Sequence, residues 1–365
     1  MKVLHINAGL ENGGGLTHIV NLLTEAKKEN KNFELLTLSE GPVAKSARIA
    51  GIDTYVLGAK SRYDINSLKK LIQFINQGHY DIVHTHGARA NLFLAMIYKK
   101  INAKWCITVH SNPYLDFEGR GIIGAIFTKL NIHALKKADC VFAVTKRFAN
   151  LLINKTHINK NKIHVIYNGI FFRTDNQIPA KYEHPYFNLI NVARVEKIKG
   201  QELLLKALKK VDDQHVRLHI AGDGSQLENL KKLANDLQIA PQVTFHGFLN
   251  QNELNNLYRR TDLATLTSYS ESFPLVLLEA SDNLVPILST DVGDIKMMIP
   301  DDNHGFVAKI GDIDSIAKQI KKAVNMNAEK LQEIAVNEKR YTENNFSVRN
   351  QLQSIESVYK KLLVE

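Results

Sequence analysis

The sequence has few cysteines and no long apolar run, and both shortages narrow what the protein can be. Its 365 residues include two cysteines, Cys106 and Cys140, each within an apolar run typical of a strand. We therefore expect two buried thiols rather than a disulfide or a pair of metal ligands. No stretch approaches the roughly 18–20 apolar residues that cross a bilayer, and the apolar run after Met1 is too short for a secretory signal. These absences predict a cytoplasmic protein, or one held peripherally at the cytosolic face of a membrane.

A dinucleotide fingerprint, internal repeats and low-complexity segments are also missing. The glycine run Gly13–Gly15 does not fit the spacing Gly-x-Gly-x-x-Gly, so a nicotinamide cofactor is not indicated. The run follows an apolar segment, Val3–Asn7, and precedes a helical pattern. A strand, a glycine turn and a helix in this order form a common cradle for a phosphate, because glycine lets the backbone approach the anion and the helix start attracts it.

The remaining features are those of an ordinary globular protein with two cores. The composition is 44% hydrophobic and 23% charged, and 365 residues suit two domains better than one. Short apolar runs alternate with helical patterns, which predicts parallel, doubly wound α/β sheets that bind ligands beyond the carboxyl ends of their strands. The expected strands are Val3–Asn7, Phe33–Leu38, Thr54–Leu57, Asp81–Thr85, Lys104–Val109, Cys140–Val144, Phe187–Ala193, Arg217–Ala221, Val243–Phe248, Leu263–Leu266 and Gly305–Lys309.

Positive charge is concentrated in the first half of the chain. The net charge is +10, and residues 1–170 hold 23 Lys and Arg against 11 Asp and Glu. Nucleic acid, an anionic membrane surface and a phosphorylated acceptor are all partners for such a surface. The lysines are scattered, however, and accompany no nucleic-acid-binding motif. We therefore expect no nucleic acid, and favour a membrane surface or a pyrophosphate-lipid acceptor over simple solvation.

Histidines lie at the ends of two predicted strands in the first half. His84 and His86 end one of them, and His110 follows the next. Two histidines on one face of an extended chain are a starting point for a zinc site. No carboxylate or cysteine completes the ligand set, so we expect no metal.

An amphipathic segment with basic flanks covers Arg120–Lys137. Its apolar residues recur at helical spacing, and Lys129, Lys136 and Lys137 accompany them. Helices beside a sheet need an apolar face for packing, whereas a helix lying on a membrane combines such a face with cations. We favour a packing helix, with a membrane-lying helix as the alternative.

The segment with the clearest chemical pattern is residues 267–280 in the second half. An apolar run predicts a strand, a polar turn follows, and Pro274 occupies a position that the first turn of a helix tolerates. Free backbone N–H groups and the positive end of a helix dipole then lie at a strand's carboxyl edge, where phosphates bind. Glu271 lies in the turn and Glu279 about two helical turns further on, which suits a ligand with a central phosphate and hydroxyls at each end. An ordinary amphipathic helix with one buried and one solvated glutamate is the alternative.

The pattern Glu271-x7-Glu279, followed by Pro286–Gly293, resembles the donor site of the retaining GT-B glycosyltransferases of glycosyltransferase family 4, also called group 1 glycosyl transferases. Arg194 and Lys199 stand in an Arg-x4-Lys-Gly segment similar to the one with which the family clamps the diphosphate of a nucleotide sugar. Two fixed cations there stabilise the charge that gathers on the leaving diphosphate as the glycosidic bond breaks. The resemblance therefore implies catalysis without a metal ion. Two solvated loop cations are the alternative.

The resemblance also implies a role for each remaining site residue. Thr108–Ser111 is similar to a strand end whose histidine hydrogen-bonds the donor sugar, so we expect His110 there, with loop capping as the alternative. Gly14 and Gly15 are similar to a glycine pair beside the donor phosphates and the acceptor. Glu271 is expected to face the sugar, and Glu279 the ribose hydroxyls. The backbone expected at the sugar and phosphate is that of Ser272, Phe273, Pro274 and Leu275.

The implied architecture is GT-B, with two Rossmann-like α/β domains facing a central cleft. We expect an acceptor-side domain at residues 1–170, a linker at Phe171–Pro185, and a nucleotide-sugar-binding domain at residues 171–345. A C-terminal helix at about 346–365 is expected to pack back on the first domain. Ser272, Pro274, Asn283 and Asp294 depart from the commonest family pattern, which leaves the donor's identity open.

The implied function is retaining transfer of a hexosyl or N-acetylhexosaminyl group from a nucleotide sugar, in the first instance a UDP-sugar. The acceptor would be a glycan or a lipid-linked intermediate of cell-surface polysaccharide biosynthesis, and no cofactor is implied beyond the donor. A nucleotide-sugar epimerase of the same architecture is one alternative, but it needs carboxylates placed for proton abstraction. An inactive GT-B scaffold subunit is another, and the intact charges at Arg194, Lys199, Glu271 and Glu279 weigh against it.

Overall fold

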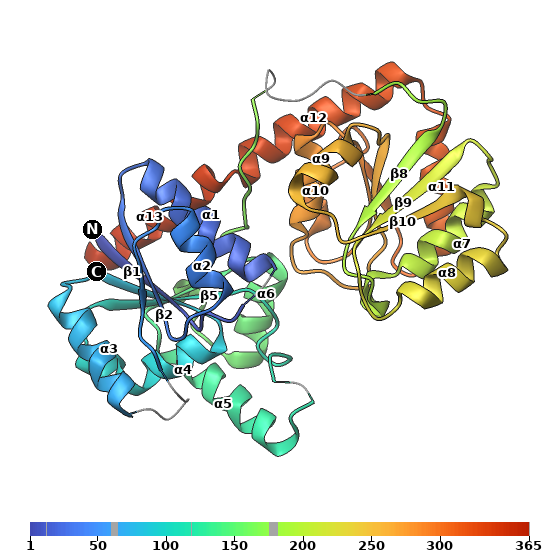
Figure 1. Ribbon diagram of the computed structural model, residues 1–365. Helices are drawn as coiled ribbons and strands as arrows, with labels where there is room; N and C mark the ends of the chain where they lie inside the picture. Colours follow the sequence, from blue (N-terminus) through green and yellow to red (C-terminus); the bar gives the residue numbers. More distant parts are fainter. Residues whose placement is uncertain (12, 60–64, 118, 175–181, 365) are drawn as a thin grey trace. The chain divides into compact units, whose positions relative to one another are not determined.

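The chain forms two compact units, each built around one parallel sheet (Figure 1). The computed structural model describes residues 1–11, 13–59, 65–117, 119–174 and 182–364. The first unit comprises Met1–Phe171 and Val348–Glu365, and the second comprises Phe172–Ser347. The chain therefore passes between the units twice. Residues 175–181 of the expected linker lie outside the described residues.

The first unit contains a seven-stranded parallel sheet in the order β3-β2-β1-β4-β5-β6-β7 within its described part. Its inner strands are buried along nearly their whole length, as expected where helices cover both faces of a parallel sheet. The strands are β1 Lys2–Asn7, β2 Asn32–Thr37, β3 Thr54–Val56, β4 Ile82–His86, β5 Lys104–Val109, β6 Cys140–Ala143 and β7 Ile163–Val165. The helices are α1 Gly14–Lys28, α2 Pro42–Ile49, α3 Ile65–Gln77, α4 Ala88–Ile97, α5 Gly121–Lys137, α6 Lys146–Leu151 and α13 Val348–Val364.

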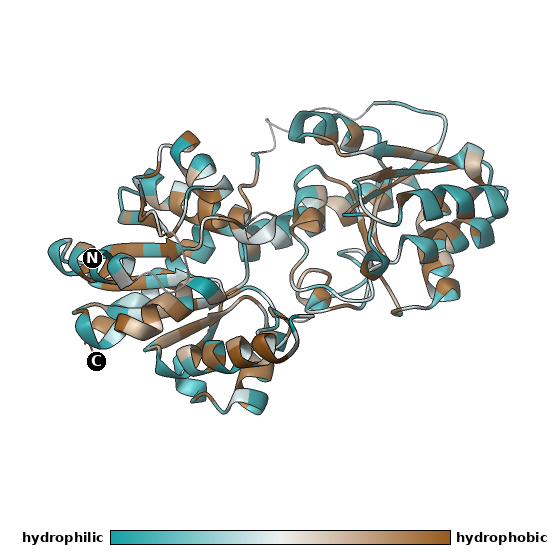
Figure 2. Cartoon of the chain, turned by 60° about the horizontal axis from the view of Figure 1, so that its bottom comes forward, coloured by the Kyte–Doolittle hydropathy of each residue, from teal (hydrophilic) through white to brown (hydrophobic). Residues whose placement is uncertain are grey.

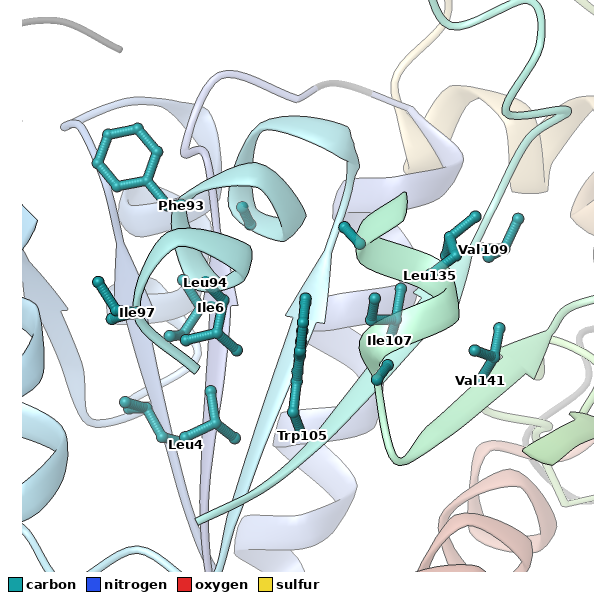
Figure 3. Close-up of a cluster of buried hydrophobic side chains, with 14 of the residues drawn as sticks. Leu4, Ile6, Phe93, Leu94, Ile97, Trp105, Ile107, Val109, Leu135 and Val141 are labelled. Atoms are coloured by element: carbon teal, nitrogen blue, oxygen red, sulfur yellow. The ribbon is translucent and has the colours of Figure 1, made fainter. Parts of the chain in front are cut away.

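One hydrophobic core of this unit lies between the sheet and helices α4 and α5 (Figure 3). Trp105 on β5 is almost completely buried there, and Phe93 and Leu94 belong to the same cluster from α4. Leu135 closes the cluster from the second half of α5. Figure 2 shows the same principle along the chain, with hydrophobic strands inside and helices that turn hydrophilic residues outward. The core fixes the direction of the strands, and hence the place where their carboxyl ends meet.

The second unit contains a six-stranded parallel sheet in the order β10-β9-β8-β11-β12-β13 in its described part. Its core lies under helices such as α7, which buries nearly every apolar residue it has. The strands are β8 Phe187–Val192, β9 Val216–Ala221, β10 Val243–Gly247, β11 Leu263–Leu266, β12 Ile287–Thr290 and β13 Phe306–Ala308. The helices are α7 Gln201–Val211, α8 Leu227–Asp236, α9 Gln251–Tyr258, α10 Leu275–Asp282, α11 Ile313–Val324 and α12 Ala328–Phe346. Two doubly wound parallel sheets confirm the expected fold class.

The last helix, α13, belongs to the first unit. It packs beside α1, and buries Leu352, Ile355 and Tyr359 in a core shared with β1 and β2. The hydroxyl of Tyr359 is hydrogen-bonded to Nδ1 of His84 on β4. The helix before it, α12, ends at Phe346 and lies in the second unit.

The favoured interpretation of Arg120–Lys137 as a packing helix is wrong for the first half of α5. Ile122, Ile123 and Ile126 are 82%, 63% and 52% exposed. The buried positions of the helix are Gly124, Asn131, Ala134 and Leu135. The periodicity predicted the helix correctly, but the sheet covers only its C-terminal part.

Both cysteines are free and buried, which confirms the expectation of two buried thiols. They lie opposite each other on β5 and β6. Among the described residues, no helix combines the length and the apolar character that crossing a bilayer requires.

Candidate active site

In the second unit, the structure brings Lys199 and Glu271 into direct contact. Lys199 ends a short helical turn after β8, and Glu271 lies in the loop between β11 and α10. Lys199 Nζ lies 2.7 Å from Glu271 Oε1, and Ser268 Oγ donates a second hydrogen bond of 2.6 Å to the same oxygen. The carboxylate therefore orients the ammonium group at the carboxyl edge of the sheet.

Two glycines allow the loops around this ion pair to approach closely. A Cβ on Gly200 would lie 2.3 Å from the carbonyl oxygen of Thr267, and a Cβ on Gly293 would lie 2.8 Å from that of Glu271. Both glycines have positive φ, at 62° and 56°, where other residues are strained. Thr267 Oγ1 also donates a 3.0 Å hydrogen bond to the carbonyl of Gly200. A side chain at either glycine would push the loop of Glu271 away from Lys199.

The start of α10 presents backbone rather than side chains. The helix begins at Leu275, so Pro274 holds the N-cap position, one residue before the first turn in which it was expected. Phe273 is buried, and its ring lies 5.2 Å from that of Phe346. Of the expected segment, Ser272 and Leu275 remain partly accessible. Within the described residues no side chain caps this helix start. The first N–H groups and the dipole of such a helix can bind an anion.

Arg194 lies in the loop after β8, beside a cavity of about 300 Å³. Phe248 and Asp223 line the same cavity, and Phe248 is 78% exposed. The backbone carbonyl of Arg194 accepts a 3.1 Å hydrogen bond from Gln201 Nε2, which fixes the loop. No hydrogen bond or ion pair in the described part joins the Arg194 side chain to Lys199 or Glu271. Arg194 is exposed at the edge of this cavity.

Glu279 lies on α10, the helix that follows this loop. Burial, and secondarily the nearby Asp282, raise the pKa of its carboxyl to about 7. Asp282 itself is held by Arg173 Nε at 2.7 Å and by Lys339 Nζ at 2.9 Å. A carboxyl that titrates near neutral pH can accept or donate a hydrogen bond to a hydroxyl group.

In the first unit, Gly14 and Gly15 form the start of α1, after Gly13 at its N-cap. A Cβ on Gly14 would meet no atom within 4 Å, whereas one on Gly15 would lie 2.7 Å from a carboxylate oxygen of Glu11. The same Glu11 carboxylate would lie 2.3 Å from a Cβ on Gly87, at the end of β4. The helix start is thus open on one side and closed by Glu11 on the other.

His110 joins a group of histidines at the carboxyl ends of β1, β4 and β5. Its Nε2 lies 3.3 Å from His86 Nδ1, and its ring lies 4.6 Å from that of His18. His86 Nε2 in turn lies 2.9 Å from His5 Nδ1. Burial lowers the pKa of each of these imidazoles, so they are neutral at physiological pH. His110 is therefore placed to donate or accept a hydrogen bond as an uncharged group.

Sequence reasoning did not identify His5 and His18 as members of this group. His5 is a buried polar residue within β1, and His18 stands among the buried positions of α1. They belong to two triads, His5-His84-His86 and His18-His86-His110. Within each triad, one ring nitrogen of each histidine lies within 4.8 Å of the other two. Neutral imidazoles are suitable metal ligands. The expectation that the protein needs no metal stays a prediction.

Two protein families match the chain, one in each unit. The family described as "Glycosyltransferase Family 4" matches residues 12–171, and the family described as "Glycosyl transferases group 1" matches residues 172–341. The chain belongs to the group 1, family 4 glycosyltransferases. The expectation of a glycosyltransferase is thereby confirmed, and the matched ranges meet at the border between the two units.

Two relatives of this glycosyltransferase have names that specify different reactions. The Bacillus anthracis protein N-acetyl-alpha-D-glucosaminyl L-malate synthase is 29% identical over 70% of this chain and 68% of its own length. An Escherichia coli protein named UDP-Gal:alpha-D-GlcNAc-diphosphoundecaprenol alpha-1,3-galactosyltransferase is 23% identical over 92% of this chain and 90% of its own.

Solved structures agree with the GT-B architecture of the glycosyltransferase. The crystal structure of Anabaena Alr3699/HepE in complex with UDP has a TM-score of 0.83, at 17% identity, over 99% of this chain and 100% of that one. A glycosyltransferase from Rickettsia africae has a TM-score of 0.81, at 20% identity, over 99% and 98%. Likeness at these identities shows the fold.

Proposed function

We propose that this glycosyltransferase moves a sugar from a UDP-sugar to a lipid-linked or glycan acceptor, with retention of anomeric configuration, in cell-surface polysaccharide biosynthesis. The observation that carries the proposal is the Lys199–Glu271 ion pair, at 2.7 Å, in the loop before an uncapped helix start. A cation, a carboxylate and free backbone N–H groups at one sheet edge suit the diphosphate and the sugar of a nucleotide sugar.

Lys199 and Arg194 would act on the leaving group. As the glycosidic bond breaks, negative charge gathers on the diphosphate, and cations held in fixed positions stabilise that charge more than they stabilise the intact donor. Glu271 would hold Lys199 in position and bind a hydroxyl of the sugar. With two cations available for the diphosphate, the transfer would need no metal ion.

Retention would follow from the leaving group itself. In the proposed mechanism, the C1–O bond to the diphosphate breaks, and the acceptor oxygen forms its bond to C1 on the same face. The proton of the acceptor hydroxyl passes to a phosphate oxygen, which has just become basic. No nucleophile of the protein takes part. The neutral imidazole of His110 would hydrogen-bond the donor sugar while the sugar carries positive charge.

The rest of the donor would be bound through Glu279 and the cavity beside Arg194. Glu279, with a pKa of about 7, would hydrogen-bond the ribose hydroxyls. Phe248 and the 300 Å³ cavity would hold the base. Uracil as the base is supported by a relative whose name specifies UDP-Gal and by the UDP complex of a protein with this fold.

Thermal stabilisation by nucleotides tests the proposal directly. A ligand at one hundred times its Kd stabilises the native state by about 2.7 kcal/mol. The unfolding midpoint of a unit of this size rises by roughly 2–4 °C per kcal/mol. We expect UDP and one UDP-sugar to raise the midpoint by several degrees, also in EDTA, and GDP and ADP to do so less. Arg194→Ala and Lys199→Ala should lose the shift, whereas Lys197→Ala, an exposed neighbour, should keep it.

The outcomes separate this proposal from its rivals. If no nucleotide stabilises the protein at millimolar concentration, an inactive scaffold becomes the better description. If a donor is converted to another free nucleotide sugar without any acceptor, the protein is an epimerase. If the stabilisation disappears in EDTA, donor binding needs a metal and the metal-free proposal is wrong.

A further inference from the structure

The first unit contains a cavity of about 530 Å³ that none of the roles above uses. Helices α4 and α5 pack together, and the cavity lies along them and the loop after β1. A volume of this size is within the range of small-molecule binding sites, roughly 300–1,000 Å³. Large apolar side chains make up much of its wall, among them Leu92, Phe93, Met96, Phe127 and Leu130.

The apolar surface continues from the cavity along the outside of α5. Leu130 lines the cavity and is 47% exposed, and Ile126, Ile123 and Ile122 follow toward the start of the helix with increasing exposure. Contiguous exposed apolar side chains on a folded unit commonly mark a binding surface. At this end of the helix Gly124 packs against the carbonyl of Phe117, where a Cβ would lie 2.4 Å from the oxygen.

The charges around this cavity are mainly positive. Arg89 and Arg120 line it, and Glu11 is the one acidic residue among the lining residues that the structure describes. Burial raises the pKa of the Glu11 carboxyl. Helix α5 has no acidic residue at all and exposes Lys129, Lys136 and Lys137. The site is therefore complementary to a molecule with an apolar body and an anionic group.

We propose that this cavity and the adjoining face of α5, Ile122–Leu130, hold the hydrocarbon chain of a lipid-linked acceptor, whose anionic group pairs with Arg89 and Arg120. The inference rests on the proposed function and selects the lipid-linked class of acceptor. A hydrocarbon chain fits because it needs no hydrogen bonds. A peptide or a sugar in the same place would lose its hydrogen bonds to water with few groups to replace them.

The location connects the chain to the reacting end of such an acceptor. Glu11 lines the cavity and also lies against Gly15 and Gly87, at the carboxyl ends of β1 and β4. His110 lies at the end of β5, the neighbouring strand of the same sheet edge. A chain held between α4 and α5 therefore directs its polar end toward this edge.

Calorimetry with three probes tests the site on the full-length protein. We use farnesyl diphosphate, which has both a chain and an anionic group, farnesol, which has the chain alone, and inorganic diphosphate. We expect farnesyl diphosphate to bind at least tenfold more tightly than inorganic diphosphate, with a negative heat-capacity change that marks apolar burial. Arg120→Glu should lower the affinity for farnesyl diphosphate at least tenfold and leave the affinity for farnesol unchanged.

Two cavity variants and a matched control locate the binding. Ala95→Trp fills the cavity from α4, and Met96→Lys places a charge at a lining position that is 50% exposed. Both substitutions should lower the affinity for farnesyl diphosphate at least tenfold. Ile49→Lys makes the same kind of change at an 88% exposed position on α2, away from the cavity, and should have no effect. Cooperative urea unfolding followed by far-ultraviolet circular dichroism verifies that each variant is folded, because UDP binding in the second unit does not report on the first.

Each result either supports or overturns the inference. Equal affinity for farnesyl diphosphate and inorganic diphosphate, or unchanged binding in Met96→Lys, overturns it. Binding to anionic phospholipid vesicles without binding of farnesyl diphosphate also overturns it, because the face then recognises a membrane surface and not a chain. If UDP stabilises the protein while farnesyl diphosphate does not bind, the acceptor inference fails and the proposed transfer from UDP stands.

Discussion

Replacing Glu279 with glutamine should change how the stability of the second unit depends on pH. The partly buried carboxyl of Glu279 has its pKa raised from the ordinary 4.5 to about 7. The folded state therefore keeps a proton that the unfolded chain releases above about pH 4.5. The free energy of unfolding of the wild type falls as pH rises from about 4.5 to 7, and stays at the lower level above pH 7. Glutamine has no proton to lose, so the variant lacks this fall.

The size of the effect follows from the pKa shift. One pKa unit corresponds to 1.36 kcal/mol, so a shift from 4.5 to about 7 corresponds to roughly 3 kcal/mol. Part of this is already lost at pH 5. We expect the stability of Glu279→Gln relative to wild type to increase by about 2–3 kcal/mol between pH 5 and pH 8.

Urea unfolding followed by two signals at the two pH values measures this change. Far-ultraviolet circular dichroism reports on both units, whereas fluorescence reports on the first, because the single tryptophan of the sequence is Trp105 on β5. The dichroism transition of the second unit should shift and the fluorescence transition should not. Glu343→Gln, at an exposed position of α12 in the second unit, is the control. A difference between Glu279→Gln and wild type that is the same at pH 5 and pH 8 would refute the reasoning.

Two further substitutions in the second unit test its loops and its buried charges. Gly293→Ala should cost roughly 1–2 kcal/mol of stability for a strained backbone and also abolish stabilisation by UDP, because the new Cβ would lie 2.8 and 3.0 Å from two carbonyl oxygens of the loop before α10. Gly311→Ala has a similarly positive φ but its nearest neighbour at 3.7 Å, so it should keep the UDP response; if both variants lose it, the close approach is not the cause. Lys339→Met should lower the free energy of unfolding by about 3 kcal/mol, because it removes a buried partner 2.9 Å from Asp282. Lys330→Met, at a side chain that is 43% exposed, should change it by less than about 0.5 kcal/mol, and an equal loss in both would contradict the prediction.

The helices and strands could be predicted from the sequence wherever buried apolar residues recur at a regular spacing. Strands such as Lys104–Val109 and Leu263–Leu266 were expected at the bounds that the structure has, because a strand covered on both faces is apolar along its whole length. Helix α5 is the instructive exception. Its periodic apolar residues predicted the helix, but periodicity does not say whether a partner covers the apolar face.

The candidate site was predictable only in part. The spacing of Glu271 and the segment of Lys199 each indicated a role, but their contact across 72 positions is a result of the tertiary fold. His18 was missed because a single histidine in an apolar helical pattern has no signature of its own. The cavity between α4 and α5 was not predictable either, since it depends on how two helices are spaced and not on either sequence segment.

Because α13 completes the first unit, that unit cannot be finished until residues 348–364 have emerged from the ribosome. Residues 1–171 emerge first, but the place of Leu352, Ile355 and Tyr359 in their core stays empty while the whole second unit is made. The second unit is continuous in sequence and can fold before its predecessor is complete. The N-terminal part of the protein is thus made first and completed last. It has to remain unaggregated, with an apolar face of α1 uncovered, while about 176 further residues are synthesised. This takes roughly nine to thirty-five seconds at about 5–20 residues per second.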